Sequence, residues 1–234
     1  MPQHIGVIGV SPEGSALFYR FLARLISEMP DQTTRPRVTI HAEPFAQYVN
    51  AIQADDWATV GHLLAESANT LARAGADFYV LPNNATHHAL PLAAAASPSP
   101  FVNMVEIVAD AIQSDGYAQI GLIGTRYVTF GSTYQTVLGL RGIKLNVPET
   151  NDAEDIDRII FQEAVHGSVS KPSIHRVAAI VDNLASIGCE AIVLGASEAS
   201  LMLDNDHIPL PVIDPVELLA RTTLVRAADE AEVP

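Results

Sequence analysis

The sequence of 234 residues contains a single cysteine, Cys189, and this scarcity excludes several kinds of site. One thiol cannot form a disulfide within the chain, and it cannot build a cysteine-rich metal centre. Cys189 precedes the apolar run at residues 191–194, where a thiol ordinarily packs as a small and chemically inert side chain. We therefore predict a structural role for this residue.

Positive charge is also scarce. The chain carries 13 Lys and Arg against 27 Asp and Glu, which gives a formal net charge of -14. Binding to nucleic acid or to an anionic membrane surface needs clustered Lys and Arg, so we predict neither kind of partner. No apolar run approaches the roughly 18 residues of a membrane span. The first apolar strand begins near His4 without a leader-like segment before it, and we expect a cytoplasmic protein.

Several common cofactor and catalytic motifs are missing. The early glycines Gly6 and Gly9 do not form a GxGxxG dinucleotide fingerprint, and no Gly-Lys-Ser/Thr phosphate loop occurs. We find neither a zinc-ligand spacing nor the Ser-His-Asp order of a hydrolase. The sequence thus predicts no metal site and no nucleotide cofactor.

Short apolar runs that alternate with helical patterns are abundant, and 48% of the residues are hydrophobic, which is enough for a sizeable core. The expected strands lie at residues 6–8, 37–40, 78–81, 120–123, 144–147 and 191–194. The expected helices lie at residues 15–29, 57–74, 104–114, 153–165 and 174–187. This alternation is typical of α/β proteins with parallel sheets and crossover helices. Turn glycines that favour a left-handed backbone are expected at Gly75, Gly116, Gly142 and Gly188.

The second half of the chain repeats the first in outline. A helix, Gly75, an apolar strand and a polar loop recur as a helix, Gly188, a strand and a polar loop 113 positions later. The repeat predicts two similar α/β lobes, each a parallel sheet flanked by helices. We expect residues 1–112 plus 210–234 in the first lobe and 113–209 in the second. Ligands of open parallel sheets gather beyond the carboxyl ends of the strands, so the two polar loops are expected to line an interlobe active-site cleft.

The two polar loops resemble signatures of the aspartate/glutamate racemase superfamily. Asn83-Asn84-Ala85-Thr86-His87 resembles the family's Cys-Asn-Thr-x-His, and Gly195-Ala196-Ser197-Glu198 resembles its Gly-Cys-Thr-Glu. Further likeness lies, in the family's order, at residues 6–20, 121–134, 142–149, 160–167 and 211–214. The resemblance covers nearly the whole chain. It implies a cofactor-independent protein of a family that racemises, isomerises or decarboxylates small acids, and it implies a homodimer.

In the family, two cysteine thiols serve as the acid and the base. The resemblance places Asn83 and Ala196 at these two positions, so both thiols are replaced in this sequence. Removal of a proton next to a carboxylate needs a base, an acid and donors for the developing oxyanion. Asparagine takes up no proton near neutral pH, and alanine has no ionisable atom. The two-cysteine mechanism of racemisation is therefore excluded for this sequence.

Glu198 and His87 are the candidate proton carriers at matching family positions. A carboxyl group on the floor of a dry cleft can have its pKa raised into the range of a general base. An acidic residue that begins a helix can instead complement the helix dipole. An imidazole is the usual proton carrier near neutral pH, whereas His87 could equally cap or pack the start of a helix. Asn83 completes the catalytic set as an oxyanion donor, and the adjacent His88 does not share a helix face with His87 for metal binding.

A second group of residues is expected to bind the substrate, namely Ser11, His41, Asn84, Thr125, Thr129 and Ser197. Hydroxyl and amide groups at the ends of parallel strands suit a carboxylate, and for Asn84 and Ser197 the alternative role is loop capping. His41, followed by Glu43, lies where some aspartate racemases contact the second carboxylate of the substrate. No arginine occupies that loop, which argues against an aspartate-like or glutamate-like substrate.

Two functions follow from these residues. The one that we favour is a diverged enzyme of the superfamily, which acts on a small carboxylic or amino acid by cofactor-independent, non-thiol proton transfer. One base without an opposed acid favours isomerase, cyclase or lyase chemistry over racemisation. The alternative is a catalytically inactive homologue that binds or senses a small acid, and the loss of both thiols motivates it. Ligand binding without turnover would distinguish the second function from the first.

Overall fold

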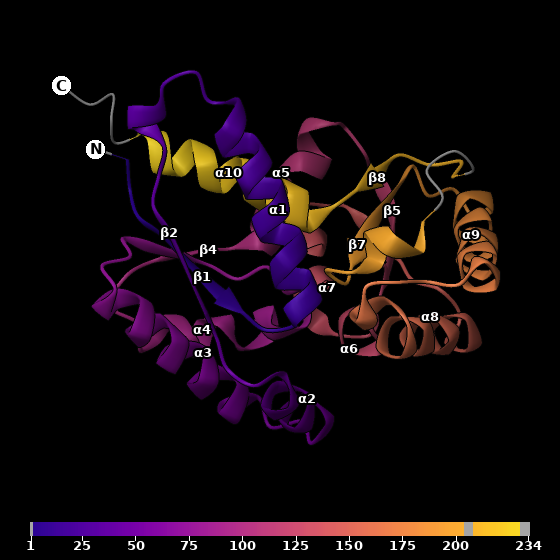
Figure 1. Cartoon of the computed structure of the whole chain (residues 1–234). Helices are drawn as coiled ribbons and strands as arrows, with labels where there is room; N and C mark the ends of the chain where they lie inside the picture. The colour runs from indigo at the N-terminus through magenta and orange to yellow at the C-terminus, as the bar shows by residue number, and fades with distance from the viewer. Residues whose placement is uncertain (1, 204–207, 230–234) are drawn as a thin grey trace. The chain divides into compact units, whose positions relative to one another are not determined.

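The computed structural model describes residues 2–203 and 208–229. The chain divides into two compact units, Met1–Met104 with Val216–Pro234, and Val105–Pro215. Within the described residues each unit contains one four-stranded sheet, and every strand pairing in both sheets is parallel. Two parallel sheets flanked by helices confirm the predicted α/β class and the predicted pair of similar lobes (Figure 1).

The first unit has the strand order β2-β1-β3-β4. It contains β1 (Ile5–Gly9), α1 (Pro12–Glu28), η1 (Gln32–Thr34), β2 (Val38–Ala42), α2 (Phe45–Gln53), α3 (Trp57–Arg73), β3 (Phe78–Val80), η2 (Ala85–Ala89), α4 (Leu90–Ala95), β4 (Phe101–Val102) and most of α10 (Pro215–Asp229), where η denotes a 3-10 helix. Figure 1 shows α1 and α10 on one side of this sheet, and α3 and α4 on the other. Gly75 ends the turn after α3 with a φ of 85°, a left-handed value that glycine adopts without steric cost.

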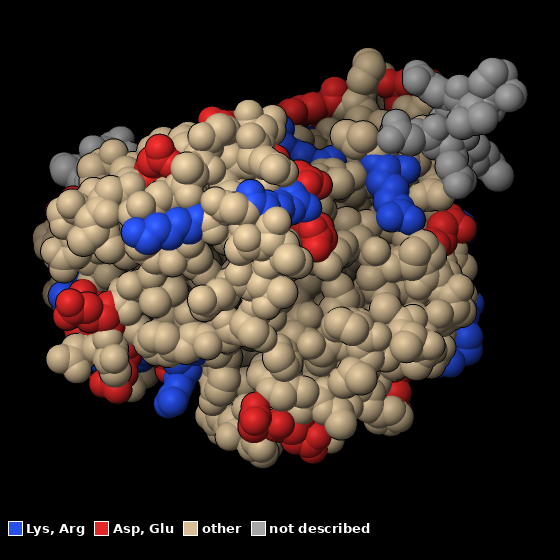
Figure 2. All heavy atoms as spheres, turned by 180° about the vertical axis from the view of Figure 1, so that it is seen from behind, with Lys and Arg blue, Asp and Glu red and all other residues tan. Residues whose placement is uncertain are grey.

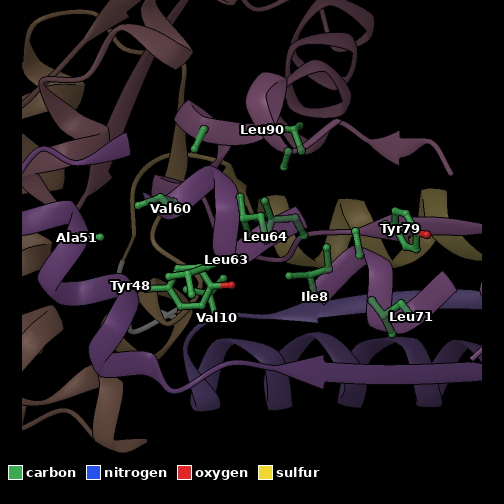
Figure 3. Packing of buried hydrophobic residues seen from close by; sticks show 14 of the residues in the cluster. Ile8, Val10, Tyr48, Ala51, Val60, Leu63, Leu64, Leu71, Tyr79 and Leu90 are labelled. Atoms are coloured by element: carbon green, nitrogen blue, oxygen red, sulfur yellow. The ribbon is translucent and has the colours of Figure 1, made fainter. Parts of the chain in front are cut away.

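The core of the first unit lies between the sheet and helices α2, α3 and α4. Ile8 from β1 and Val10 just after it pack with Tyr48, Leu64 and Leu90, all buried (Figure 3). Burying one such aliphatic side chain stabilises a fold by about 1.5–3 kcal/mol. The carboxyl end of β1 is thereby held against three helices, which keeps the loops at that end in place.

The second unit has the strand order β6-β5-β7-β8, the same arrangement as in the first unit. It contains most of α5 (Met104–Ser114), then β5 (Gln119–Gly124), α6 (Arg126–Thr129), α7 (Ser132–Leu140), β6 (Lys144–Asn146), α8 (Thr150–Gln162), η3 (Ala164–His166), α9 (Lys171–Ser186), β7 (Ala191–Gly195), η4 (Ala199–Met202) and β8 (Val212–Ile213). Its core joins Ile123 and Ile192 of the sheet to Ile156 of α8 and Val181 of α9, and Cys189 is buried in the same cluster. Burial also raises the pKa of the Cys189 thiol, as expected for an inert side chain.

The predicted strands and the long predicted helices are present, with ends that differ by a few residues. All four predicted turn glycines have a positive φ. The sequence pattern did not reveal β8, which is two residues long, or the helices α2, α4, α6, α7 and α10. A two-residue strand offers no alternation to detect, and α4 and α6 have only six and four residues, too few for a helical period.

Among residues 2–203 and 208–229, no helix combines the length and the apolar character that a membrane crossing requires. On the face shown in Figure 2, the Lys and Arg side chains form separate small groups instead of one continuous patch, and several lie beside Asp or Glu. Ion pairs of this kind within the second unit include Arg176 with Asp152 and Asp155.

Candidate functional site

Ser11 lies two residues after the end of β1 and immediately before α1. Its Oγ atom accepts the backbone N–H of Gly14 at 3.3 Å, and its carbonyl oxygen accepts the hydroxyl of Ser15 at 2.7 Å. The side chain is buried, with 4% exposed. Ser11 is therefore the N-cap of α1, a role that satisfies one of the unpaired N–H groups of the first helical turn. Ser11-Pro12-Glu13 in the sequence is a recognisable signal for this helix start.

Asn83, in the loop after β3, has a side chain with a determined orientation. Its Oδ1 atom accepts the backbone N–H of Thr86 at 3.1 Å and the Thr86 hydroxyl at 3.0 Å. A backbone N–H can only donate, so the oxygen of the amide must face Thr86 and the NH₂ group must point away. Asn83 is half-buried. This position consequently presents a hydrogen-bond donor that cannot turn into an acceptor without breaking the loop.

His87 is buried, with 4% exposed, and both of its ring nitrogens are engaged. Nδ1 lies 2.8 Å from the carbonyl oxygen of Asn83, and Nε2 accepts the backbone N–H of Met104 at 3.2 Å. Because Nε2 accepts, the proton of the neutral ring must sit on Nδ1, where it is donated to Asn83. Burial lowers the pKa of His87 to about 4, although the hydrogen bond to Asn83 opposes this shift. The geometry favours the packing role of His87 over proton transfer.

The neighbours of His87 in the same loop differ from it. Asn84 is buried and precedes η2, but its side chain does not cap that helix. His88 is exposed, and its ring centroid lies 4.4 Å from that of Trp57 at the start of α3. Because the buried Asn84 side chain makes no capping bond to η2, simple helix capping is disfavoured as its role. The His88 imidazole, by contrast, lies on the surface.

His41 is the penultimate residue of β2. Its Nδ1 atom lies 3.1 Å from the hydroxyl of Ser67, which belongs to α3 and is fully buried. Its Nε2 atom lies 3.8 Å from a carboxylate oxygen of Glu43. Sequence reasoning placed His41 at the substrate, but it missed Ser67, because nothing in the pattern relates a helix serine to a strand histidine 26 positions earlier.

In the second unit, β5 and β7 end in glycines that face each other. Gly124 and Gly195 are paired in the sheet register. A Cβ atom on Gly124 would lie 2.6 Å from the carbonyl oxygen of Gly195 and 2.8 Å from its Cα, closer than atoms can approach. Glycine at position 124 therefore lets the two strand ends come together, and it brings the residues that follow them, Thr125 and Ala196, to the same end of the sheet.

Thr125 carries a hydroxyl that the fold buries without using it. The residue is 9% exposed, and its Oγ1 atom has no hydrogen-bond partner among the described residues. The hydroxyl of Thr129, one helical turn later, donates to the carbonyl of Gly124 at 3.2 Å. The carboxylate of Asp157 accepts the N–H of Arg126 at 2.9 Å and so fixes the loop. A buried polar atom without a partner is costly, so Thr125 marks a position where a ligand atom would be stabilising.

Ala196, Ser197 and Glu198 follow β7 and are all buried, with 6%, 3% and 4% exposed. Glu198 immediately precedes η4, yet its side chain makes no capping bond to that helix. The helix has four residues and hence a small dipole. Complementing a helix is accordingly a weak reason for a buried carboxyl group at this position.

Each unit thus contributes polar groups at the carboxyl ends of its parallel strands, where such sheets bind ligands. The first unit offers the Asn83 amide, Asn84 and His41, and the second offers Thr125, Ser197 and Glu198. Within the part of the chain that the structure describes, no three His, Cys, Asp or Glu side chains are arranged to hold a metal ion.

Comparisons with known proteins agree with this architecture. The model of the family described as Asp/Glu/Hydantoin racemase matches residues 5–223. A candidate Asp/Glu racemase from Yersinia pestis is 26% identical, with a TM-score of 0.86 over 96% of this chain and 99% of that one. An aspartate racemase homologue from Pyrococcus horikoshii OT3 is 25% identical, with a TM-score of 0.82 over 97% and 99%. Glutamate racemase from Francisella tularensis, solved in complex with D-glutamate, shares the fold at 15% identity, with a TM-score of 0.69 over 100% and 84%.

Proposed function

This chain belongs to the Asp/Glu/Hydantoin racemase family, and from that membership we propose that it is an enzyme that transfers a proton at a carbon atom of a small carboxylic or amino acid. The proposed reaction uses no cofactor and no thiol. It belongs to the isomerase, cyclase or lyase type, because Asn83 and Ala196 stand at the two positions where the resemblance places the family's thiols.

The observation that carries this proposal is the buried carboxyl group of Glu198. It lies two positions after Ala196, in the loop that follows β7, and it is 4% exposed without capping the helix that it precedes. A carboxyl group held out of water at a ligand-binding edge is suited to act as a general base or acid. We therefore assign the proton transfer to Glu198. For His87, burial lowers the pKa to about 4, so this imidazole is a poor proton carrier near neutral pH.

Neutral donors support the same proposal. Proton removal next to a carboxylate produces an enolate-like transition state whose negative charge needs hydrogen-bond donors. Thr125 has a buried hydroxyl without a partner, Ser197 is a buried hydroxyl residue, and Asn83 presents an NH₂ group of fixed orientation. We propose that these groups, with Asn84 and Thr129, bind the substrate and stabilise the developing charge.

The proposed substrate is a small acid because the family is described by racemases of aspartate, glutamate and hydantoin, and the first two are small acids. One fold relative was solved in complex with D-glutamate. All 13 Lys and Arg of this chain lie among the described residues, and none of them is buried. A second carboxylate would ordinarily be bound by a guanidinium group in bidentate geometry. We accordingly favour substrates with one carboxylate over aspartate-like or glutamate-like ones.

A protein that binds a small acid without turning it over is the second candidate. Its motivation is the replacement of both family thiols, at Asn83 and Ala196. The donors at Thr125 and Ser197 would serve a binding protein as well as an enzyme. The two candidates differ in one respect, which is whether the protein breaks a carbon–hydrogen bond.

Proton NMR in deuterium oxide tests the proposal directly. The purified protein is incubated with a panel of small amino, hydroxy and dicarboxylic acids, and the incorporation of deuterium next to the carboxylate is scored together with new products. We expect exchange or product formation that falls at least ~100-fold in Glu198→Gln. Glu154→Gln, at an exposed position of α8, is the matched control and should react like the unmodified protein. Saturable binding of an acid without exchange or product would instead establish the binding protein.

A further inference from the structure

The three histidines near the strand ends of the first unit differ in the availability of their ring nitrogens. His87 has both nitrogens bonded to backbone groups. His88 is exposed and lies against the ring of Trp57. His41 has one nitrogen anchored by a hydroxyl group and the other near a carboxylate. Of these three, His41 is the imidazole that a buried hydroxyl group orients while its side chain stays partly exposed.

The residue that anchors His41 is buried, whereas the His41 side chain is partly exposed. Ser67 is 0% exposed on α3, and its hydroxyl lies 3.1 Å from Nδ1. Glu43 lies 3.8 Å from Nε2, and the side chains of His41 and Glu43 are each 27% exposed. When both ring nitrogens carry hydrogen, Nδ1–H must be donated to Ser67 and Nε2–H faces the Glu43 carboxylate. Both contacts therefore accommodate the charged imidazole as well as the neutral one.

We propose that His41 is a catalytic residue that carries a proton on Nε2, with Ser67 as its positioning residue and Glu43 as the adjacent counter-charge. This inference rests on the proposed function and adds a second acid/base group to it. In the step that we assign to His41, the Nε2–H bond breaks and its electron pair stays on the ring. The proton passes to the carbanion-like carbon of the substrate, where a new carbon–hydrogen bond forms, and the ring then takes up a proton from water.

The titratable groups near the contact between His41 and Ser67 come from three segments. Glu43 follows β2, while Glu66 and the buried Tyr48 come from α3 and α2. Burial, aided by the charges of Glu43 and Glu66, raises the pKa of Tyr48 to about 12, so the phenol stays neutral at working pH. Glu66 pairs with His62 at 3.3 Å on the exposed surface of α3.

The test compares deuterium exchange in His41→Gln, Ser67→Ala and the control His62→Gln. His62 has the same pairing with a glutamate as His41, but its side chain is 72% exposed on a helix surface. We expect exchange to fall at least ~100-fold in His41→Gln, with loss of one limb of the pH profile of kcat. Ser67→Ala should lower kcat about tenfold and shift the midpoint of that limb, with little change in KM, because the ring remains but is no longer held. His62→Gln should match the unmodified protein.

Three results would overturn the inference, and they separate it from the proposed function. Exchange that is lost in Glu198→Gln but changes less than about twofold in His41→Gln, with the same pH profile, would remove His41 and leave the proposed function standing. A Ser67→Ala profile identical to that of the unmodified protein would remove the positioning role. Absence of exchange in the unmodified protein would remove both proposals. If circular dichroism shows that His41→Gln is unfolded, the test uses His41→Asn instead, because asparagine keeps a polar atom near the position of Nδ1.

Discussion

His87 joins the loop after β3 to the beginning of α5, because its Nε2 atom accepts the backbone N–H of Met104 at 3.2 Å. The first N–H groups of a helix have no partner inside the helix, and here a buried imidazole from another segment supplies one. The other ring nitrogen is bound to the carbonyl of Asn83. A histidine at a motif position can thus stabilise the loop itself.

The low pKa of His87 makes stability depend on pH. In the folded protein this pKa is about 4, against an ordinary value of 6.5. Between these values the unfolded chain binds more protons at this residue than the folded protein, so the free energy of unfolding falls as the pH decreases from about 6.5 to about 4. We expect His87 to account for a loss of about 2–3 kcal/mol between pH 7.5 and 4.5.

Urea unfolding of the unmodified protein and of His87→Gln at these two pH values measures this loss. His87→Gln should be less stable at pH 7.5 and should lose less stability on acidification. An equal loss in both proteins would contradict the assignment of the pH dependence to His87.

The hydroxyl of Thr125 should matter for ligand binding and not for folding. Thr125→Val removes a buried oxygen that has no partner among the described residues, so we expect unchanged or slightly higher stability. Affinity for a small acid should fall about tenfold, the value of one hydrogen bond to a charged group. Thr129→Val is the contrasting variant, because it loses the bond to Gly124 and should be destabilised by about 1 kcal/mol. Calorimetric titration and thermal unfolding give the two quantities. Equal affinities of Thr125→Val and the unmodified protein would refute the role of Thr125.

Two substitutions separate the roles of the Asn83 side chain as a hydrogen-bond acceptor and as a hydrogen-bond donor. Asn83→Asp keeps an oxygen for the N–H and hydroxyl of Thr86, so we expect the folding stability to be retained. It replaces the NH₂ donor with a negatively charged oxygen, and the affinity for a carboxylate should fall more than tenfold. Asn83→Ala loses the bonds to Thr86 and should be destabilised by about 1–2 kcal/mol. A fully retained affinity in Asn83→Asp, measured by calorimetry at neutral pH, would show that the amide does not face the ligand.

The glycine contact between β5 and β7 should not tolerate a methyl group. Gly124→Ala would place Cβ 2.6 Å from the carbonyl oxygen of Gly195, and the strand ends would have to separate. We expect a destabilisation of at least about 2 kcal/mol. Gly139→Ala in α7 meets no atom within 4 Å and should raise stability by up to about 1 kcal/mol, because alanine has the higher helix propensity. Chemical unfolding of the two variants makes the comparison, and equal stabilities would show that the backbone contact is loose.

The fold was predictable from the sequence because its strands are buried on both faces and read as unbroken apolar runs, such as Ala191–Gly195. The turn glycines indicated where helices and turns end, because glycine adopts a left-handed backbone without steric cost. Helix α1 begins at Pro12, three residues before the predicted start. The signal Ser11-Pro12-Glu13 was present and was interpreted as part of a substrate loop. Its cap function competes with ligand binding for the same oxygen atom.

The candidate site was predictable in its location and less so in its roles. Motif positions indicated Asn83, His87 and Glu198, but the role of each depends on partners that local spacing does not determine. Met104 lies 17 positions after His87, and Ser67 lies 26 positions after His41. The packing of α5 and α3 brings these pairs together. The orientation of the Asn83 amide likewise follows from a bond to Thr86 that a motif comparison does not contain.

The facing glycines at positions 124 and 195 also restrict how this part of the protein can evolve. A side chain at position 124 would collide with the main chain of the neighbouring strand, and one at position 195 would press on Val128 and Leu122, so single substitutions there are penalised. The next positions along the chain, Thr125 and Ala196, have no such constraint from the glycine contact. Substitutions are therefore tolerated more readily in the residues just beyond the strand ends than in the glycines themselves. Chemical novelty can accumulate there while the backbone that presents it stays the same.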